Sequence, residues 1–337
     1  MKYRYLGSTG LKVAQICLGT MTFSREADAS TSQTILDYYL DCGGNFVDTA
    51  DAYGPQGRAG ASESVLGQWL KRKRDEVIVS TKVGFPTSTG LNDLGLSRAH
   101  IVKELERSLQ RLKTDYVDLY HVHCWDLATP LEETLSVLDG LVRSGKVRYL
   151  GVSNYMAWQL MKALGMCDRY RLERFVSAQM QYSLVVRDIE REIIPLCESE
   201  GLSILAWGPL GGGFLSGKYR KGEKPSGDSR LVEVKENEEE AWSRRATERN
   251  FQIAATVGKI AKSRDISHSQ VALAWLLDRN VIPIIGARNL EQLKVNLASA
   301  EVSLNSEEKE NLDRVSWIDK GYPFRFIHEV YPNRRTI

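Results

Sequence analysis

The 337-residue sequence predicts an α/β protein, a (β/α)8 TIM barrel with an N-terminal hairpin and a long loop after the seventh strand. Three observations support this fold class. Short apolar runs recur along the chain at intervals of roughly thirty residues, as the parallel strands of such a barrel do. The segments between them carry apolar residues three and four positions apart, which is the period of a helix that covers a core. No Gly-x-Gly-x-x-Gly pattern follows the first run, which disfavours the alternative, a doubly wound open sheet.

The first predicted element is a small hairpin. Residues 3–13 alternate polar and apolar side chains around Ser8, Thr9 and Gly10, and we expect this hairpin to plug one end of the barrel. The eight expected strands are Ile16–Leu18, Phe46–Val47, Val77–Val79, Val117–Tyr120, Tyr149–Val152, Phe175–Ala178, Ile204–Trp207 and Val281–Ile285. Helical spacing between them is clear at Ile101, Leu105, Leu109 and Leu112, and again at Leu131, Leu135, Leu138 and Leu141.

The interval between the seventh and eighth strands is much longer than the others. It begins with Gly211, Gly212 and Gly213 and ends in two helical patterns near Asp278. Long insertions in compact domains are commonly lids or binding loops, although a surface excursion without a role is the alternative. Beyond the eighth strand we expect helices over 290–297 and 306–318.

We expect a single domain over residues 1–337, with the hairpin in residues 1–14 and a C-terminal tail in residues 319–337. This tail is aromatic and is predicted to be irregular. It would cover the barrel mouth or pack against its side.

Composition indicates a globular protein without an obvious macromolecular partner. Hydrophobic residues are 42% and charged residues 26%, as in folded domains, and the net charge of +2 does not indicate nucleic acid. The basic run 71–74 is followed by Asp75 and Glu76, so it is interpreted as a solvated helix end. Five cysteines without paired spacing indicate reduced thiols, and no segment resembles a signal peptide or a membrane span. We therefore expect a cytoplasmic protein with no nucleic-acid or membrane partner, and the oligomeric state stays open.

Polar side chains suited to chemistry follow the ends of the predicted strands. Asp48 and Tyr53 follow the second strand, Lys82 the third, and His121 and His123 the fourth. In barrels of this type the chemistry lies at these carboxyl ends. A buried ammonium at Lys82 needs a partner, and Asp48 is the obvious one. A cation beside Tyr53 would lower the pKa of the phenol toward the range of an acid catalyst, and His123 could donate to a substrate carbonyl.

A histidine pair at a strand end also fits a metal-dependent hydrolase. His121 and His123 have the same parity, so strand geometry points both toward the same face. A metal site would need further histidines on later strands, and His100, His268 and His328 lie at no predicted strand end. We therefore expect no bound metal.

The segments that carry these residues resemble the aldo-keto reductases. The matching segments, in the family's order, are 45–53, 81–84, 118–126, 151–154, 179–182, 207–219 and 285–296. The resemblance implies a barrel that binds NADPH without a Rossmann motif and reduces aldehydes or ketones to alcohols, so the partner is a small carbonyl compound. It also implies that Tyr53 is the general acid, that Lys82 tunes it, that Asp48 anchors Lys82, and that His123 rather than His121 orients the carbonyl.

A second set of residues is expected to hold the cofactor. Trp207 offers a flat face on which a nicotinamide could stack. Hydrogen bonds to its carboxamide could come from the side chains of Ser153, Asn154 and Gln179. The glycine-rich sequence after Trp207 is interpreted as a cradle for the pyrophosphate, and Arg288 would bind the adenosine phosphate at a helix N-terminus. The expected contacts are Thr20, Met21, Asp48, Ser153, Asn154, Gln179, Trp207, Gly208, Pro209, Leu210, Gly212, Lys218, Arg230, Gly286, Arg288, Gln292 and Asn296.

Two further expectations concern cofactor choice and the kind of function. No carboxylate lies in segment 286–290 to bind a ribose diol, so the sequence predicts NADPH over NADH. Segments 208–219 and 95–98 are similar to the branch of the family that includes potassium-channel β-subunits. This similarity implies an alternative, a cofactor-sensing regulatory subunit with little turnover, although the complete set of four site residues favours an enzyme. Met21, Phe23 and Trp125 indicate an apolar or aromatic substrate pocket, with packing in the core as the alternative for the same residues.

Overall fold

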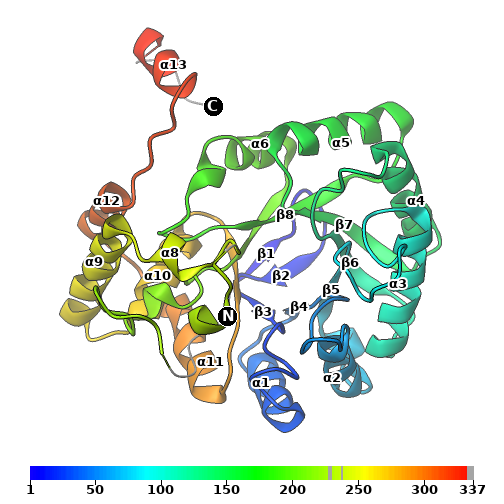
Figure 1. Cartoon of the computed structure of the whole chain (residues 1–337), viewed down its shortest axis with the longest axis horizontal. Coiled ribbons are helices and arrows are strands. Elements are labelled where there is room, and N and C mark those ends of the chain that lie inside the picture. Colours follow the sequence, from blue (N-terminus) through cyan, green and yellow to red (C-terminus); the bar gives the residue numbers. More distant parts are fainter. Residues whose placement is uncertain (227–229, 237, 332–337) are drawn as a thin grey trace.

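The structure of the chain, a computed structural model, describes residues 1–226, 230–236 and 238–331. Its centre is a closed barrel of parallel strands surrounded by helices (Figure 1). The strands are β3 (Cys17–Gly19), β4 (Phe46–Asp48), β5 (Ile78–Val83), β6 (Val117–Val122), β7 (Val147–Ser153), β8 (Phe175–Gln181), β9 (Ser203–Trp207) and β10 (Ile282–Ile285). Neighbouring strands follow chain order, and β10 closes the barrel by pairing with β3. The predicted fold class and its eight strands are confirmed.

Several strands run further than their apolar runs predicted. β5 continues from Val79 to Val83 through Ser80 and Lys82, whose side chains are fully buried. Polar side chains do not end these strands because they find hydrogen-bond partners inside the barrel. The extra residues carry the site described below.

The helices cover the outside of the barrel. The longer ones are α1 (Ala29–Asp41), α2 (Ala61–Leu70), α3 (Arg98–Leu112), α4 (Leu131–Arg143), α5 (Ala157–Tyr170), α6 (Ile193–Glu200), α9 (Glu248–Arg264), α10 (His268–Asp278), α11 (Leu290–Leu297) and α12 (Ser306–Val315). Short 3₁₀ helices are η1 (Arg74–Glu76), η2 (Asp188–Glu190), η3 (Phe214–Ser216) and η4 (Ala298–Glu301). Asp28, Ser97 and Thr247 begin α1, α3 and α9 by accepting hydrogen bonds from first-turn N–H groups.

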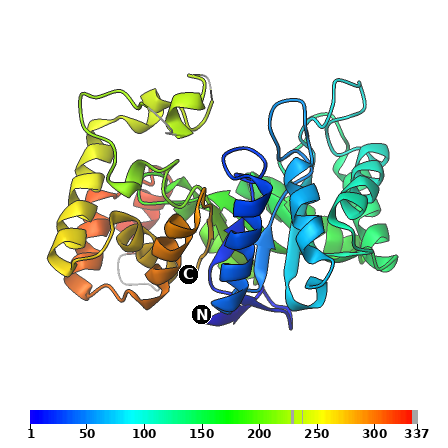
Figure 2. The same ribbon diagram turned by 90° about the horizontal axis from the view of Figure 1, so that it is seen from below.

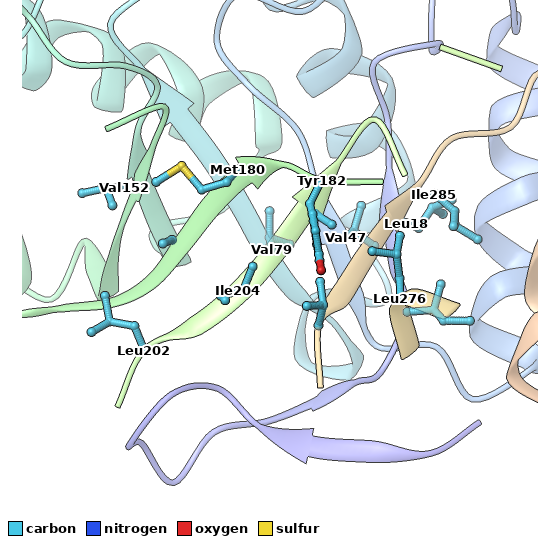
Figure 3. Packing of buried hydrophobic residues seen from close by; sticks show 14 of the residues in the cluster. Leu18, Val47, Val79, Val152, Met180, Tyr182, Leu202, Ile204, Leu276 and Ile285 are labelled. Carbon is cyan, nitrogen blue, oxygen red and sulfur yellow. The ribbon is translucent and has the colours of Figure 1, made fainter. Parts of the chain in front are cut away.

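The main core lies between the strands and these helices. Successive side chains of a strand point to opposite faces, so every second residue of a barrel strand faces outward, toward the helices. Figure 3 shows Val47, Val79 and Ile204 among these outward residues, together with Leu276 of α10. All of these side chains are buried, which fixes the helices against the barrel.

A smaller core fills the barrel's interior at its amino-terminal end. Phe46, Ile78 and Leu119 point inward there and pack with Leu6 and Val13 of the hairpin. The hairpin pairs β1 (Tyr3–Tyr5) with β2 (Lys12–Ala14) in antiparallel fashion, and it lies below the barrel in Figure 2. The predicted plug is confirmed, and only the opposite end, where the long loops stand in Figure 2, is left for a site.

The long segment after β9 folds back over the carboxyl end. It contains η3, then α7 (Arg230–Glu233) and α8 (Trp242–Arg245), which stand on the same side as the other long loops (Figure 2). Leu231 is buried and lies directly on Gly212, since a Cβ added to Gly212 would come within 2.9 Å of it. The described parts of this segment therefore touch the glycine-rich loop.

The C-terminal tail differs from its prediction. Residues expected to be irregular form α13 (Phe324–Val330), which contains neither glycine nor proline, so its backbone N–H groups can bond four residues back. The helix stands away from the barrel in Figure 1, over neither the mouth nor the side. Phe326 and Ile327 are consequently exposed.

Three sequence-level expectations can be compared directly with the structure. Helix α2 ends at Leu70, and the basic run begins at its C-cap, as predicted; Lys71 and Arg72 are exposed, but Arg74 is only 15% exposed because it pairs with Asp118. All five cysteines are free thiols. Within the described residues, none of the helices combines the length and the apolar character needed to cross a bilayer.

Candidate active site

Asp48 and Lys82 form a buried ion pair at the carboxyl ends of β4 and β5. Lys82 Nζ lies 2.5 Å from Asp48 Oδ2, and the two side chains are 0% and 2% exposed, so water does not compete for either charge. In the strand register Asp48 lies beside Ser80, which brings the inward-facing Lys82 within reach of it. Asp48 Oδ1 also accepts hydrogen bonds from Ser80 Oγ (2.9 Å) and Gln179 Nε2 (3.0 Å). Three donors therefore hold the carboxylate, as a buried ion pair requires.

Tyr53 shares the same ammonium group. Lys82 Nζ donates to the Thr49 carbonyl at 2.7 Å and to Tyr53 Oη at 3.3 Å. Burial acts to lower the pKa of Lys82, but the charges of Asp48 and Tyr53 outweigh burial and raise that pKa. The cationic form of Lys82 is therefore favoured, and this charge stabilises the phenolate form of Tyr53 relative to the phenol.

His123 completes the group predicted from the sequence. Its ring centroid lies 5.9 Å from that of Tyr53, and Phe85 stacks on its face at 3.9 Å. Burial, together with the charges of Lys82 and His121, lowers the pKa of His123 well below its ordinary value. A neutral imidazole keeps one N–H to donate, so Tyr53 and His123 are two neighbouring hydrogen-bond donors at the open end of the barrel.

His121 has a different environment from His123. Its ring nitrogens lie 3.1 Å from Ser80 Oγ and 3.1 Å from Ser177 Oγ, inside the barrel. Gly151 makes room for the ring, because an added Cβ would lie 2.3 Å from it. The interpretation of His121 as a satisfied neighbour is confirmed. Across the described ranges, no three His, Cys, Asp or Glu side chains are placed to hold a metal ion.

The residues predicted to face a nicotinamide lie together but bond to one another. Trp207 Nε1 donates to Asn154 Oδ1 at 3.0 Å, and Asn154 Nδ2 donates to the His123 carbonyl at 2.8 Å. Ser153 Oγ donates to the Gln179 carbonyl at 2.8 Å. This chain of hydrogen bonds connects β6, β7, β8 and β9 at their carboxyl ends.

Two residues near the first strand lie deeper than expected. Thr20 is fully buried; its hydroxyl donates to the Asp48 carbonyl (3.1 Å) and accepts from Ser62 Oγ (2.8 Å). Its cofactor contact stays a prediction, as does that of the half-buried Met21. Phe23 is fully buried in the main core, so of its two expected roles, pocket wall and packing, packing is the one the structure shows.

A cavity of about 870 Å³ lies between the glycine-rich loop after β9 and the start of α11. Nine of the predicted cofactor residues line it, namely Gly208, Pro209, Leu210, Gly212, Lys218, Gly286, Arg288, Gln292 and Asn296. Eleven other residues line it and were not among the expected contacts, namely Thr22, Glu26, Gly213, Ser216, Ser269, Ile284, Ile285, Ala287, Asn289, Glu291 and Val295. The side chain of Arg230 lies outside the part of the chain that the structure describes.

The shape and charge of this cavity fit a dinucleotide. Gly211, Gly212 and Gly213 have φ values of 59°, 67° and 89°, a backbone conformation that residues other than glycine rarely adopt. Such a loop lets backbone N–H groups approach a phosphate closely. Burial and then the charge of Arg288 lower the pKa of Lys218, which indicates that the two cations share the cavity. An anion between them would relieve their repulsion.

A carboxylate also lies beside Arg288, which the sequence did not predict. Glu26 Oε1 is 3.4 Å from Arg288 Nη2, although the two residues are 262 positions apart. Segment 286–290 contains no carboxylate, but the loop between β3 and α1 brings one to Arg288. The sequence argument for a preference for NADPH is therefore incomplete.

Comparison with known proteins gives the family of the chain. Residues 15–316 match the Aldo/keto reductase family. The chain is 39% identical over 316 residues to "Uncharacterized oxidoreductase YrpG" of Bacillus subtilis, covering 91% of this chain and 93% of that protein. It is 34% identical over 340 residues to a norsolorinic acid reductase of Aspergillus flavus, covering 96% and 83%. It is 35% identical over 309 residues to a probable voltage-gated potassium channel subunit beta of Arabidopsis thaliana, covering 90% and 92%. The chain belongs to the aldo/keto reductase family.

Proposed function

We propose that this protein is an NADPH-dependent carbonyl reductase that converts aldehydes or ketones to alcohols, with Tyr53 as the general acid. The observation that carries the proposal is the position of Lys82, whose ammonium group donates to both Asp48 and Tyr53. Membership of the aldo/keto reductase family and similarity to oxidoreductases support carbonyl reduction as the reaction class.

The cavity residues would hold the cofactor. Lys218, Arg288 and the glycine loop offer cations and backbone N–H groups to the phosphates, while Trp207 and Asn154 lie on the side toward His123. When bound, NADPH supplies a hydride to the carbonyl carbon of the substrate.

The proton comes from Tyr53. As the carbonyl oxygen gains negative charge it takes the proton of the Tyr53 hydroxyl, whose O–H bond breaks while the O–H bond of the alcohol forms. The ammonium of Lys82 stabilises the phenolate that remains, and Asp48 keeps Lys82 in position. The N–H of neutral His123 donates to the same carbonyl oxygen and stabilises its developing charge.

Aromatic side chains border this end of the barrel. Phe85 is 38% exposed while stacked on His123, so one face of its ring is available to a substrate. Trp125, in the loop after β6, contacts Tyr155 in the loop after β7 and Trp158 in the first turn of α5. These rings favour apolar carbonyl compounds over small hydrophilic ones.

NADPH oxidation measured across aldehydes, ketones, quinones and sugars tests the proposal. We expect turnover with several aldehydes or ketones, and more with aromatic members than with sugars. The second candidate, a cofactor-sensing regulatory subunit, is motivated by the similarity to the Arabidopsis protein. It predicts tight NADPH binding, slow release and negligible turnover throughout the panel.

A further inference from the structure

Glu26 and Arg288 form an ion pair in the wall of the cofactor cavity. Glu26 Oε1 lies 3.4 Å from Arg288 Nη2, and both side chains line the cavity of about 870 Å³. The side chains are 15% and 21% exposed, so solvent screens the pair only in part. The guanidinium best placed to bind an adenosine phosphate is therefore already facing a negative charge.

The loop that carries Glu26 is held in place before any ligand binds. The N–H groups of Arg25, Glu26 and Ala27 all donate to the Thr22 carbonyl, at 3.2, 3.0 and 3.0 Å. Thr22 Oγ1 in turn donates to the Ala287 carbonyl at 2.8 Å, which ties this turn to the residue before Arg288. The backbone that carries this carboxylate is thus tied to the chain beside Arg288.

One oxygen of this carboxylate has spare accepting capacity. Glu26 Oε2 is buried and has no hydrogen-bond partner among the described residues, while Oε1 also lies 3.7 Å from Arg25 Nη2. A buried carboxylate oxygen is stabilised by a donor. The 2′-hydroxyl of an unphosphorylated ribose is a donor, whereas a 2′-phosphate dianion is an acceptor that a carboxylate repels.

We propose that Glu26 is a specificity-determining residue. It weakens the binding of a 2′-phosphate by Arg288, so the same cavity can bind either NADH or NADPH. This inference rests on the proposed function, because it requires that a nicotinamide dinucleotide occupies the cavity. Glu26 lowers the preference for NADPH in two ways. It neutralises part of the charge of Arg288, and its own negative charge repels the 2′-phosphate that only NADPH carries.

The test is the change in cofactor preference in Glu26→Gln. Dissociation constants of NADPH and NADH are measured by fluorescence titration, and those of the fragments 2′,5′-ADP and 5′-AMP, which differ only by the 2′-phosphate, by calorimetry. We expect the wild type to bind both dinucleotides. In Glu26→Gln the ratio of the NADH constant to the NADPH constant should rise about tenfold, with the same change for the fragment pair. If Glu26→Gln does not fold, Glu26→Ala should show the same change.

Glu291→Gln is the matched control. Glu291 also lines the cavity, but its carboxylate pairs with Lys294 at 2.8 Å and is 77% exposed, so its removal should leave the ratio within twofold of wild type. Glu26→Asp keeps the charge and should stay within threefold. An unchanged ratio in Glu26→Gln, with NADPH still bound and turned over, overturns this inference alone. A wild type that binds neither dinucleotide nor fragment overturns the proposed function and this inference with it.

Discussion

Tyr53→Phe is the most direct test of the proposed chemistry. Phenylalanine keeps the ring and removes the hydroxyl that would supply the proton. A general acid contributes roughly 10²- to 10⁴-fold to the rate, so turnover should fall by two to four orders of magnitude, which is about 3–5 kcal/mol on the barrier. NADPH binding should persist, because no predicted cofactor contact is altered.

The structure also predicts that Tyr53→Phe folds normally. Lys82 loses one hydrogen bond of 3.3 Å but keeps those to Asp48 and the Thr49 carbonyl, so the free energy of unfolding should fall by only about 1 kcal/mol. Turnover is measured with the best substrate of the panel, NADPH affinity by fluorescence, and stability by thermal unfolding. Tyr116→Phe makes the same chemical change at the opposite end of the barrel, beside Arg74, and should retain full turnover. Turnover of Tyr53→Phe within tenfold of wild type would refute the mechanism.

Three further predictions concern the cofactor, the buried acids and the loop after β9. Arg288→Ala should weaken NADPH roughly ten- to a hundred-fold and leave NADH little changed, since a charged hydrogen-bonding partner is worth about 1.5–3 kcal/mol; equal weakening in equilibrium titrations would contradict the phosphate assignment. Burial, and then the charges of Glu63 and Glu104, raise the pKa of Asp51 well above its ordinary 3.8, so the folded chain holds a proton that the unfolded chain releases as pH rises. Asp51→Asn cannot titrate, and its stability relative to wild type should increase by about 1.4 kcal/mol per pH unit above pH 4, up to the folded pKa. Urea unfolding at several pH values measures this difference, and a constant difference would disprove it. NADPH should slow protease cutting between residues 213 and 245 if that segment closes over the cofactor, whereas identical cutting with and without NADPH would argue against a lid.

The sequence by itself determined the barrel and the composition of its catalytic end. The repeating helices and apolar runs have local periods, and side chains on strands alternate with a period of two, so both can be recognised without tertiary contacts. Asp48, Lys82 and His123 were identified because each ends a strand, and parallel strands of a barrel end at the same rim. The run of glycines marked the loop that lines the cavity for a similar reason, since its backbone conformation excludes most other residues.

Only the tertiary structure decided how loops meet and which side chains lie beneath the surface. Glu26 faces Arg288 because the turn after β3 bonds to the chain after β10, and no local pattern encodes a contact between residues 262 positions apart. Phe23 belongs to the core rather than to the pocket, although an apolar aromatic side chain suits both places. Loops and tails lack a repeating period, so their positions depend on packing against distant segments, and that packing exists only once the barrel has closed.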